Sequence, residues 1–296
     1  MAHLHVSPAP AIVTRHAPPE LNKLSGDLRW SYSPSRDGID SNLLVLMHGL
    51  GDTMKPFAQL GQSLNLPQTA VLTLQAPHQI PLLEEEAFAW WPSFTELGEL
   101  IPNPNPSKTV TLLIKLIEHL TSSEPGPAWQ ANQLHLFGFA QGGSCAAELA
   151  LSWSRHVRIQ QTPTTIPKIG SPSQHTSASK ASTSDETLQL GSIVAVSAPL
   201  LSHPSIGSQK CGTKVLLVSR RGEDRLVGSG SWRKAFENVK DIVLSSGQSQ
   251  SMLRGQAEWI EVMRFWSETL VRRSQLELSG ELYTINSGVV SAPRSS

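Results

Sequence analysis

Cysteine is scarce in this chain. The sequence contains two cysteines, Cys145 and Cys211, and both lie in apolar surroundings. Two isolated thiols provide neither a disulfide framework nor a cluster of metal ligands, and this usage is typical of a reducing compartment. We therefore expect a cytoplasmic protein with no metal site and no cofactor.

Long apolar runs and a net charge are also absent. No apolar run approaches the roughly 20 residues of a membrane-spanning helix, and the first residues lack the basic start and long apolar core of a secretory signal. Lysine plus arginine total 24 and aspartate plus glutamate total 24, so no overall field attracts nucleic acid or an anionic membrane. We expect no nucleic-acid partner and no membrane span.

Apolar runs alternate with helical patterns along the chain, which indicates an α/β fold with a mostly parallel, doubly wound sheet. Five runs are typical of buried strands: 43–47, 71–74, 134–137, 193–196 and 215–218. A helix is expected from Ser107, as its N-cap, to Leu120. A late helix is expected from the apolar stripe of Trp259, Met263, Trp266 and Leu270. We predict a single domain over residues 1–273.

Two stretches have too few large apolar residues to offset the entropy of ordering them. Residues 160–189 are dominated by Ser, Thr, Gln, Pro and Lys, and we predict a disordered insertion there. Residues 274–296 have a similar but less biased composition, and we predict that they form a flexible C-terminal tail. Neither stretch indicates a chemical function.

The segment 138–142 reads GFAQG, which is the G-x-S-x-G pattern of a serine hydrolase with alanine at the central position. In that pattern a strand turns sharply into a helix and exposes the central side chain, and the glycines avoid collisions with neighbouring backbone. Ala140 has no hydroxyl group to act as a nucleophile. The sequence predicts the turn without its reactive group.

Several motifs together resemble one known family. HGLGD at 48–52, Ala-Pro at 76–77, Trp90-Trp91 and GFAQGG at 138–143 occur in the order found in the phospholipase/carboxylesterase family, which includes the acyl-protein thioesterases. The resemblance covers roughly residues 40–270. It implies the α/β-hydrolase fold and cleavage of carboxylic esters or of the thioesters of lipidated proteins, if the catalytic residues are present.

The resemblance implies a triad in the chain order Ser, Asp, His. Asp224 matches the acid position, although it is also interpretable as an ordinary surface carboxylate. The last histidine of the sequence is His203, so none follows Asp224, and Gln250 stands at the position of the base. Glutamine does not accept a proton at neutral pH, so the general base, typically worth about 10²–10⁴ in rate, is missing as well.

The resemblance also places an oxyanion hole at the backbone N–H groups of Leu50 and Gln141, which require no particular side chain. It assigns His48 to the pocket wall, with a role as a displaced base as the alternative. Trp90 and Trp91 are predicted to form an apolar pocket wall. Ser144 and Cys145 follow the turn within one helical turn, and we interpret them as small packing residues rather than substitute nucleophiles.

Three hypotheses of function remain at this stage. The first is a catalytically deficient member of the family, a pseudo-hydrolase that binds an acyl or lipidated-peptide ligand. The second is an active ester or thioester hydrolase that uses unconventional residues. The third is an interaction scaffold that acts through residues 160–189.

Overall fold

The computed structural model describes residues 4–8, 15–21, 28–81, 83–123, 127–161, 187–202, 209–245, 247–274, 277–278 and 283–287. Within these ranges, the helices do not combine the length and the apolar character that a membrane crossing requires.

A seven-stranded sheet forms the centre of the molecule, with the strand order β10-β9-β8-β7-β3-β4-β2. All neighbouring strands are parallel except the edge strand β2, which pairs with β4 in the antiparallel sense. The bounds of these strands are β2 (Trp30–Ser33), β3 (Asn42–Met47), β4 (Thr69–Leu74), β7 (Leu134–Phe139), β8 (Ser192–Val196), β9 (Lys214–Arg220) and β10 (Val239–Leu244).

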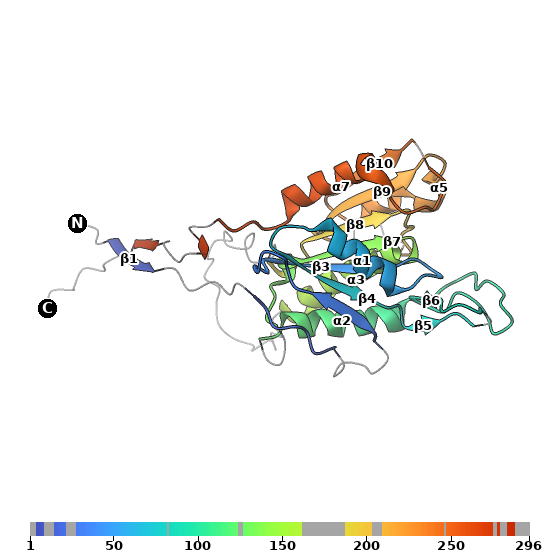
Figure 1. Ribbon diagram of the computed structural model, residues 1–296, viewed down its shortest axis with the longest axis horizontal. Helices are drawn as coiled ribbons and strands as arrows, with labels where there is room; N and C mark the ends of the chain where they lie inside the picture. The colour runs from blue at the N-terminus through green and yellow to red at the C-terminus, as the bar shows by residue number, and fades with distance from the viewer. Residues whose placement is uncertain are drawn as a thin grey trace, which may run out of the picture.

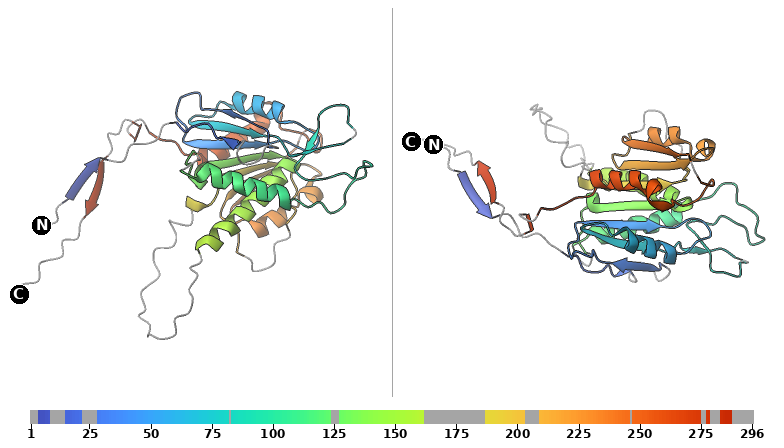
Figure 2. Two further views of the ribbon diagram at one scale, coloured as in Figure 1. Left: turned by 90° about the horizontal axis from the view of Figure 1, so that it is seen from below. Right: turned by 45° about the horizontal axis from the view of Figure 1, so that its top comes forward.

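Helices cover both faces of this sheet (Figures 1 and 2). Contacts place α2 and α3 together on one face and α1 on the other, and α7 lies on the α1 side. The helices are α1 (Met54–Leu64), α2 (Ser107–Thr121), α3 (Gln141–Gln161), α5 (Asp224–Val227), α6 (Ser229–Ala235) and α7 (Gly255–Thr269). The predicted α/β fold is confirmed.

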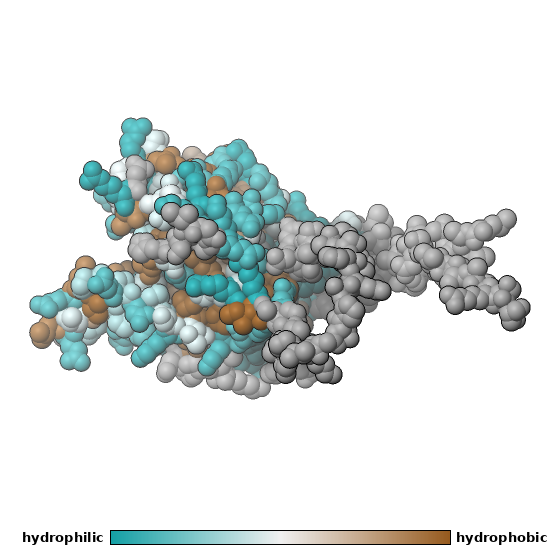
Figure 3. All heavy atoms as spheres, turned by 180° about the vertical axis from the view of Figure 1, so that it is seen from behind, coloured by the Kyte–Doolittle hydropathy of each residue, from teal (hydrophilic) through white to brown (hydrophobic). Residues whose placement is uncertain are grey.

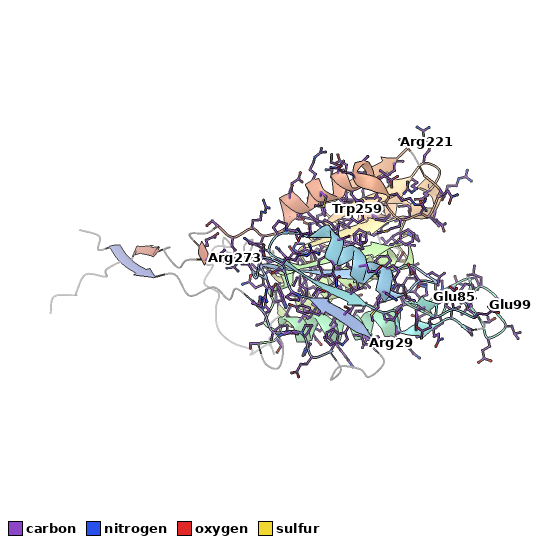
Figure 4. All side chains as sticks on the ribbon, viewed as in Figure 1. Arg29, Glu85, Glu99, Arg221, Trp259 and Arg273 are labelled. Carbon is purple, nitrogen blue, oxygen red and sulfur yellow. The ribbon has the colours of Figure 1, made fainter. Side chains whose placement is uncertain are left out.

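The alternation of side chains along the strands divides the core into two clusters. On β3, Val45 packs into the cluster beneath α2 and α3, whereas its neighbour Leu46 packs into the cluster beneath α1 and α7. This is the two-residue period of a strand that is buried on both faces. In the second cluster Trp259 of α7, labelled in Figure 4, stacks on Phe137 of β7 with ring centroids 5.6 Å apart.

All five predicted strands are present, but two flanking strands were not predicted. The edge strand β2 and β10 are partly exposed, so neither forms a continuous apolar run. The prediction of Ser107 as the N-cap of α2 is wrong, because Pro106 holds that position. The Ser107 N–H is instead bound by the side-chain carbonyl of Asn105, at 3.0 Å.

Parts of the two predicted irregular stretches have regular structure. Helix α3 continues through residues 160 and 161, and the Trp153 indole N–H donates to the carbonyl of Leu188, at 2.8 Å. Residues 162–186 lie outside the described residues. Within the predicted tail, β11 (Tyr283–Ser287) pairs in the antiparallel sense with β1 (Leu4–Pro8), and Figure 1 shows this pair beside the main body.

Candidate active site

The turn from β7 into α3 carries Ala140 in a left-handed backbone conformation. Its φ is 47°, a region that costs a residue with a side chain about 1–3 kcal/mol. The Ala140 N–H donates to the carbonyl of Val196 at the end of the neighbouring strand β8, at 2.8 Å. The predicted strand-to-helix turn is therefore formed, and the Ala140 methyl group stands at its apex, partly exposed.

Three glycines make this turn possible because other backbone lies against them. A Cβ atom added to Gly138 would lie 2.4 Å from the backbone of Gly142, and one added to Gly142 would lie 2.4 Å from the carbonyl oxygen of His48. A Cβ on Gly143 would lie 2.6 Å from the Ala198 side chain. No side chain fits at such distances, so the glycine pattern follows from close packing of the turn.

His48 is a fully buried structural residue of the loop after β3. Its Nε2 atom accepts the backbone N–H of Ala76, at 3.0 Å, which requires the proton to be on Nδ1, and that atom lies 2.7 Å from the carbonyl of Gly49. Burial lowers the pKa of His48, so the ring is neutral. Both nitrogens are already engaged within the protein, which favours the structural role over that of a displaced base.

Gln141 connects the turn to the tryptophan segment. Its side-chain oxygen accepts the backbone N–H of Trp90 at 2.7 Å, and its amide nitrogen donates to the Ser93 hydroxyl at 2.8 Å. The Trp90 indole N–H donates in turn to the His48 carbonyl at 2.8 Å. Trp90 and Trp91 are both buried in the core cluster, so their assignment to an open pocket wall stays a prediction.

Of the two predicted oxyanion donors, Leu50 lies in a loop that a backbone hydrogen bond holds, and Gln141 begins helix α3. Leu50 is 40% exposed, and the next N–H, that of Gly51, donates to the Phe88 carbonyl at 2.9 Å. Gln141 is the first residue of α3, and the N–H groups of a first helical turn have no acceptor within the helix. Both positions suit donation to an anion, and the oxyanion assignment stays a prediction.

The carboxylate that faces the Gln250 loop belongs to Glu223. Glu223 is 1% exposed, and its carboxylate accepts the backbone N–H of Gln250, the Ser249 hydroxyl at 3.1 Å and the Arg220 N–H at 2.8 Å. Burial acts to raise the pKa of Glu223, but these hydrogen bonds outweigh it, so the pKa lies below its ordinary value. Glu223 is therefore ionised at neutral pH.

Asp224, the predicted acid position, begins the short helix α5, and its side chain lies outside the described residues. Its role therefore stays a prediction. Sequence reasoning missed Glu223, because a glutamate beside a matching aspartate gives no signal of its own.

Gln250, the predicted replacement for the base, is exposed and has a left-handed backbone, with φ of 54°. Arg220 holds this loop, because its guanidinium donates to the carbonyls of Ser251 at 3.3 Å and Met252 at 3.1 Å. The same guanidinium pairs with both carboxylate oxygens of Glu258, at 2.9 and 2.8 Å. These hydrogen bonds anchor the Gln250 loop, and the assignment of Gln250 to the base position stays a prediction.

Ser144 and Cys145 are buried within α3. The Ser144 hydroxyl donates to the Pro199 carbonyl at 2.5 Å, and burial raises the pKa of the Cys145 thiol well above its ordinary value. A buried, protonated thiol is a poor nucleophile, which agrees with the interpretation of both residues as packing residues. Across the described residues, no group of three or more His, Cys, Asp or Glu side chains is arranged to hold a metal ion.

Comparison with known proteins agrees with this architecture. The family model described as Phospholipase/Carboxylesterase matches residues 35–162. An uncharacterized hydrolase of Mycosarcoma maydis is 37% identical over 271 residues, which cover 90% of this chain and 89% of that protein.

Solved structures share the fold at low identity. Esterase PE8 superposes with a TM-score of 0.57 at 18% identity, covering 82% of this chain and 99% of that chain. The acyl-protein thioesterase 2 of Zea mays gives 0.54 at 17% identity, with the same coverage of 82% and 99%. The chain belongs to the phospholipase/carboxylesterase family and has the α/β-hydrolase fold.

Proposed function

We propose that this chain is a pseudo-hydrolase, a member of its family that lacks ester and thioester hydrolysis and binds an acyl or lipidated-peptide ligand. The observation that carries the proposal is Ala140 at the apex of the turn, with its strained φ of 47°. A serine hydrolase places its nucleophile at this apex. Alanine there supplies a methyl group, which attacks nothing.

The missing base supports the same conclusion independently. No histidine follows residue 203 in the sequence, and the exposed Gln250 occupies the loop in which the family resemblance places the base. Because Glu223 accepts hydrogen bonds from two backbone N–H groups and from the Ser249 hydroxyl, most of its roughly four lone-pair sites are occupied. This carboxylate acts as a loop anchor and not as the orienting partner of an imidazole.

The binding half of the proposal rests on the parts that remain. The glycines of the turn keep their close contacts, and the loop of Leu50 and the start of α3 at Gln141 keep N–H groups suited to an acyl oxygen. Strain held at such a turn is a feature of ligand sites. A carbonyl bound there would be polarised but not attacked.

Hydrolysis of p-nitrophenyl acetate tests the catalytic half. The purified chain is expected to match the buffer rate, and so is its Ser144→Ala variant. Turnover well above buffer that is lost in Glu223→Gln or Asp224→Ala would overturn the proposal. Ala140→Ser alone is expected to remain far below an intact triad, because no base deprotonates the new hydroxyl.

Fluorescence polarisation tests the binding half. A labelled peptide that carries a thioester-linked palmitoyl group is expected to bind saturably and to be recovered intact. The same peptide without the lipid is not expected to bind. Equal binding of the two peptides would contradict an acyl site. The other two hypotheses gain no support from the structure, since Ser144 is buried and residues 162–186 lie outside the described residues.

A further inference from the structure

A cavity of about 570 Å³ opens at the carboxyl end of β4, beside the first turn of α2. Its size falls within the range of small-molecule sites. Ala140, Gln141 and Gln250 do not line it, so it is separate from the turn that forms the candidate active site. The cavity is lined by Arg29, Gln75, Ala76, Pro77, His78, Gln79, Phe88, Lys108, Thr109 and Leu112.

The charge of this lining has one sign. Arg29, before β2, and Lys108, in the first turn of α2, contribute permanent positive charges, and no aspartate or glutamate lines the cavity. The Arg29 guanidinium lies 5.2 Å from the centroid of the Phe88 ring and forms an exposed ion pair with Glu86, at 3.7 Å. Figure 4 labels Arg29 near the β2 edge of the sheet. Lys108 forms no ion pair within the described part of the chain.

Several polar side chains of the lining are already committed to the protein, which leaves the cations as the available donors. The Thr109 hydroxyl donates to the Trp90 carbonyl, and the Gln75 amide contacts His48 at 2.7 Å and accepts the Met54 N–H at 3.0 Å. Because exposed surface ion pairs contribute little to stability, the Arg29–Glu86 pair yields easily to a stronger anion.

Two further features favour a negative ligand. Lys108 is the second residue of α2, a helix of 15 residues with no acidic residue in its first turn, so the partial positive charge of the helix start is not neutralised there. Burial and then the charge of Lys108 lower the pKa of His78, which indicates a positive local potential at the cavity. The case for an anion-binding site rests on the two cations of the lining and not on the helix start.

We propose that this cavity binds a small organic phosphate monoester. Arg29 and Lys108 contact the phosphate oxygens, and Phe88 and Leu112 cover the organic group. A phosphate monoester carries about −1.5 to −2 charges at neutral pH, which matches two permanent cations better than a single carboxylate does. An arginine fork also fits phosphate oxygens in a bidentate manner. This proposal is independent of the pseudo-hydrolase proposal.

Isothermal titration calorimetry of the full chain with phenyl phosphate tests the site. Saturable binding is expected, with a Kd weakened at least about 10-fold in Arg29→Gln and in Lys108→Gln, since a charge-assisted hydrogen bond is worth about 1.5–3 kcal/mol. Lys115→Gln is the matched control, because it removes the same charge from an exposed position on the same helix. Unchanged circular dichroism and thermal midpoints establish that the variants are folded.

Companion ligands identify the chemistry. Phenol, which lacks the phosphate, and benzoate, which carries one charge, are expected to bind at least about 10-fold more weakly than phenyl phosphate. Vesicles that contain phosphatidic acid distinguish a lipid headgroup from a free phosphate monoester as the natural source. No saturable heat up to about 10 mM phenyl phosphate, or equal affinity in the wild type and in Lys108→Gln, would overturn the proposal.

Discussion

The carboxylate of Glu223 accepts the backbone N–H of Gln250, so the loop after β9 holds the loop after β10 in place. The family resemblance predicts the acid and the base of a triad in these two loops. The buried carboxylate of Glu223 contacts the backbone of Gln250, the residue at the predicted base position. The contact orients a loop and not an imidazole, which follows from the lack of any histidine after residue 203.

Glu223→Gln is expected to destabilise the fold by about 1–3 kcal/mol, because a buried amide leaves some of the N–H and hydroxyl donors without an acceptor. Urea unfolding at pH 7 measures this. The exposed Glu99, labelled in Figure 4, provides the control, and Glu99→Gln is expected to change stability by less than about 0.5 kcal/mol. Equal effects of the two substitutions would show that Glu223 anchors nothing.

The Arg220–Glu258 pair, which anchors the same region, is expected to contribute strongly to the free energy of unfolding. Arg220 is 2% exposed, and Glu258→Gln removes the carboxylate that its buried guanidinium binds through two hydrogen bonds, at a cost of about 3 kcal/mol or more. Glu261 on the same helix pairs with the exposed Lys240 at 3.3 Å, so Glu261→Gln is expected to cost about 1 kcal/mol or less. Thermal or urea unfolding of the two variants compares them, and a reversed order would contradict the structure.

Glycine at position 140 is expected to stabilise the protein. Relief of the left-handed φ of 47° exceeds the added entropy of the unfolded chain, so Ala140→Gly raises the unfolding free energy by about 0.5–1 kcal/mol. Ala257→Gly, at an exposed position within α7, is expected to lower it by a similar amount. Urea unfolding should show changes of opposite sign in the unfolding free energy of the two variants. A destabilising Ala140→Gly would mean that the turn is not strained.

His135 is expected to make stability depend on pH. Burial lowers its pKa to about 3, whereas an unfolded histidine titrates near 6.5, so the unfolded chain takes up a proton first. The stabilisation is complete above about pH 6.5 and is lost as the pH falls toward about 3, at up to roughly 1.4 kcal/mol per pH unit.

A His135→Leu variant isolates this contribution. The slope of unfolding free energy between about pH 6 and pH 4 should be shallower in the variant than in the wild type. The comparison is made on slopes because the substitution also removes the contact of His135 with the Ser192 hydroxyl, at 2.8 Å. Parallel slopes would show that His135 is protonated in the folded state.

The sequence was sufficient to predict the five central strands of the sheet, because buried parallel strands form continuous apolar runs. It did not reveal β2 or β10, whose partly exposed positions carry mixed side chains such as Lys240 and Asp241. The N-cap of α2 was misassigned because a cap depends on side-chain geometry, here that of Asn105, and not on residue type alone.

The turn at Ala140 was predictable because its glycines follow from steric necessity. The buried anchor was not, because Glu223 and Asp224 are adjacent acidic residues and residue type alone does not show that the Glu223 carboxylate turns inward. The cationic cavity was also invisible, since Arg29, His78 and Lys108 are far apart in the sequence and are brought together by the β4 and α2 connections.

The most direct test of the central claim is the intact mass of the purified chain after incubation with a fluorophosphonate probe. The account predicts an unmodified mass, because a methyl group occupies the position of the attacking hydroxyl at residue 140 and no histidine lies beyond the acid loop. A stoichiometric covalent adduct on the folded chain, mapped by peptide sequencing to a residue at the β7–α3 turn, would contradict it.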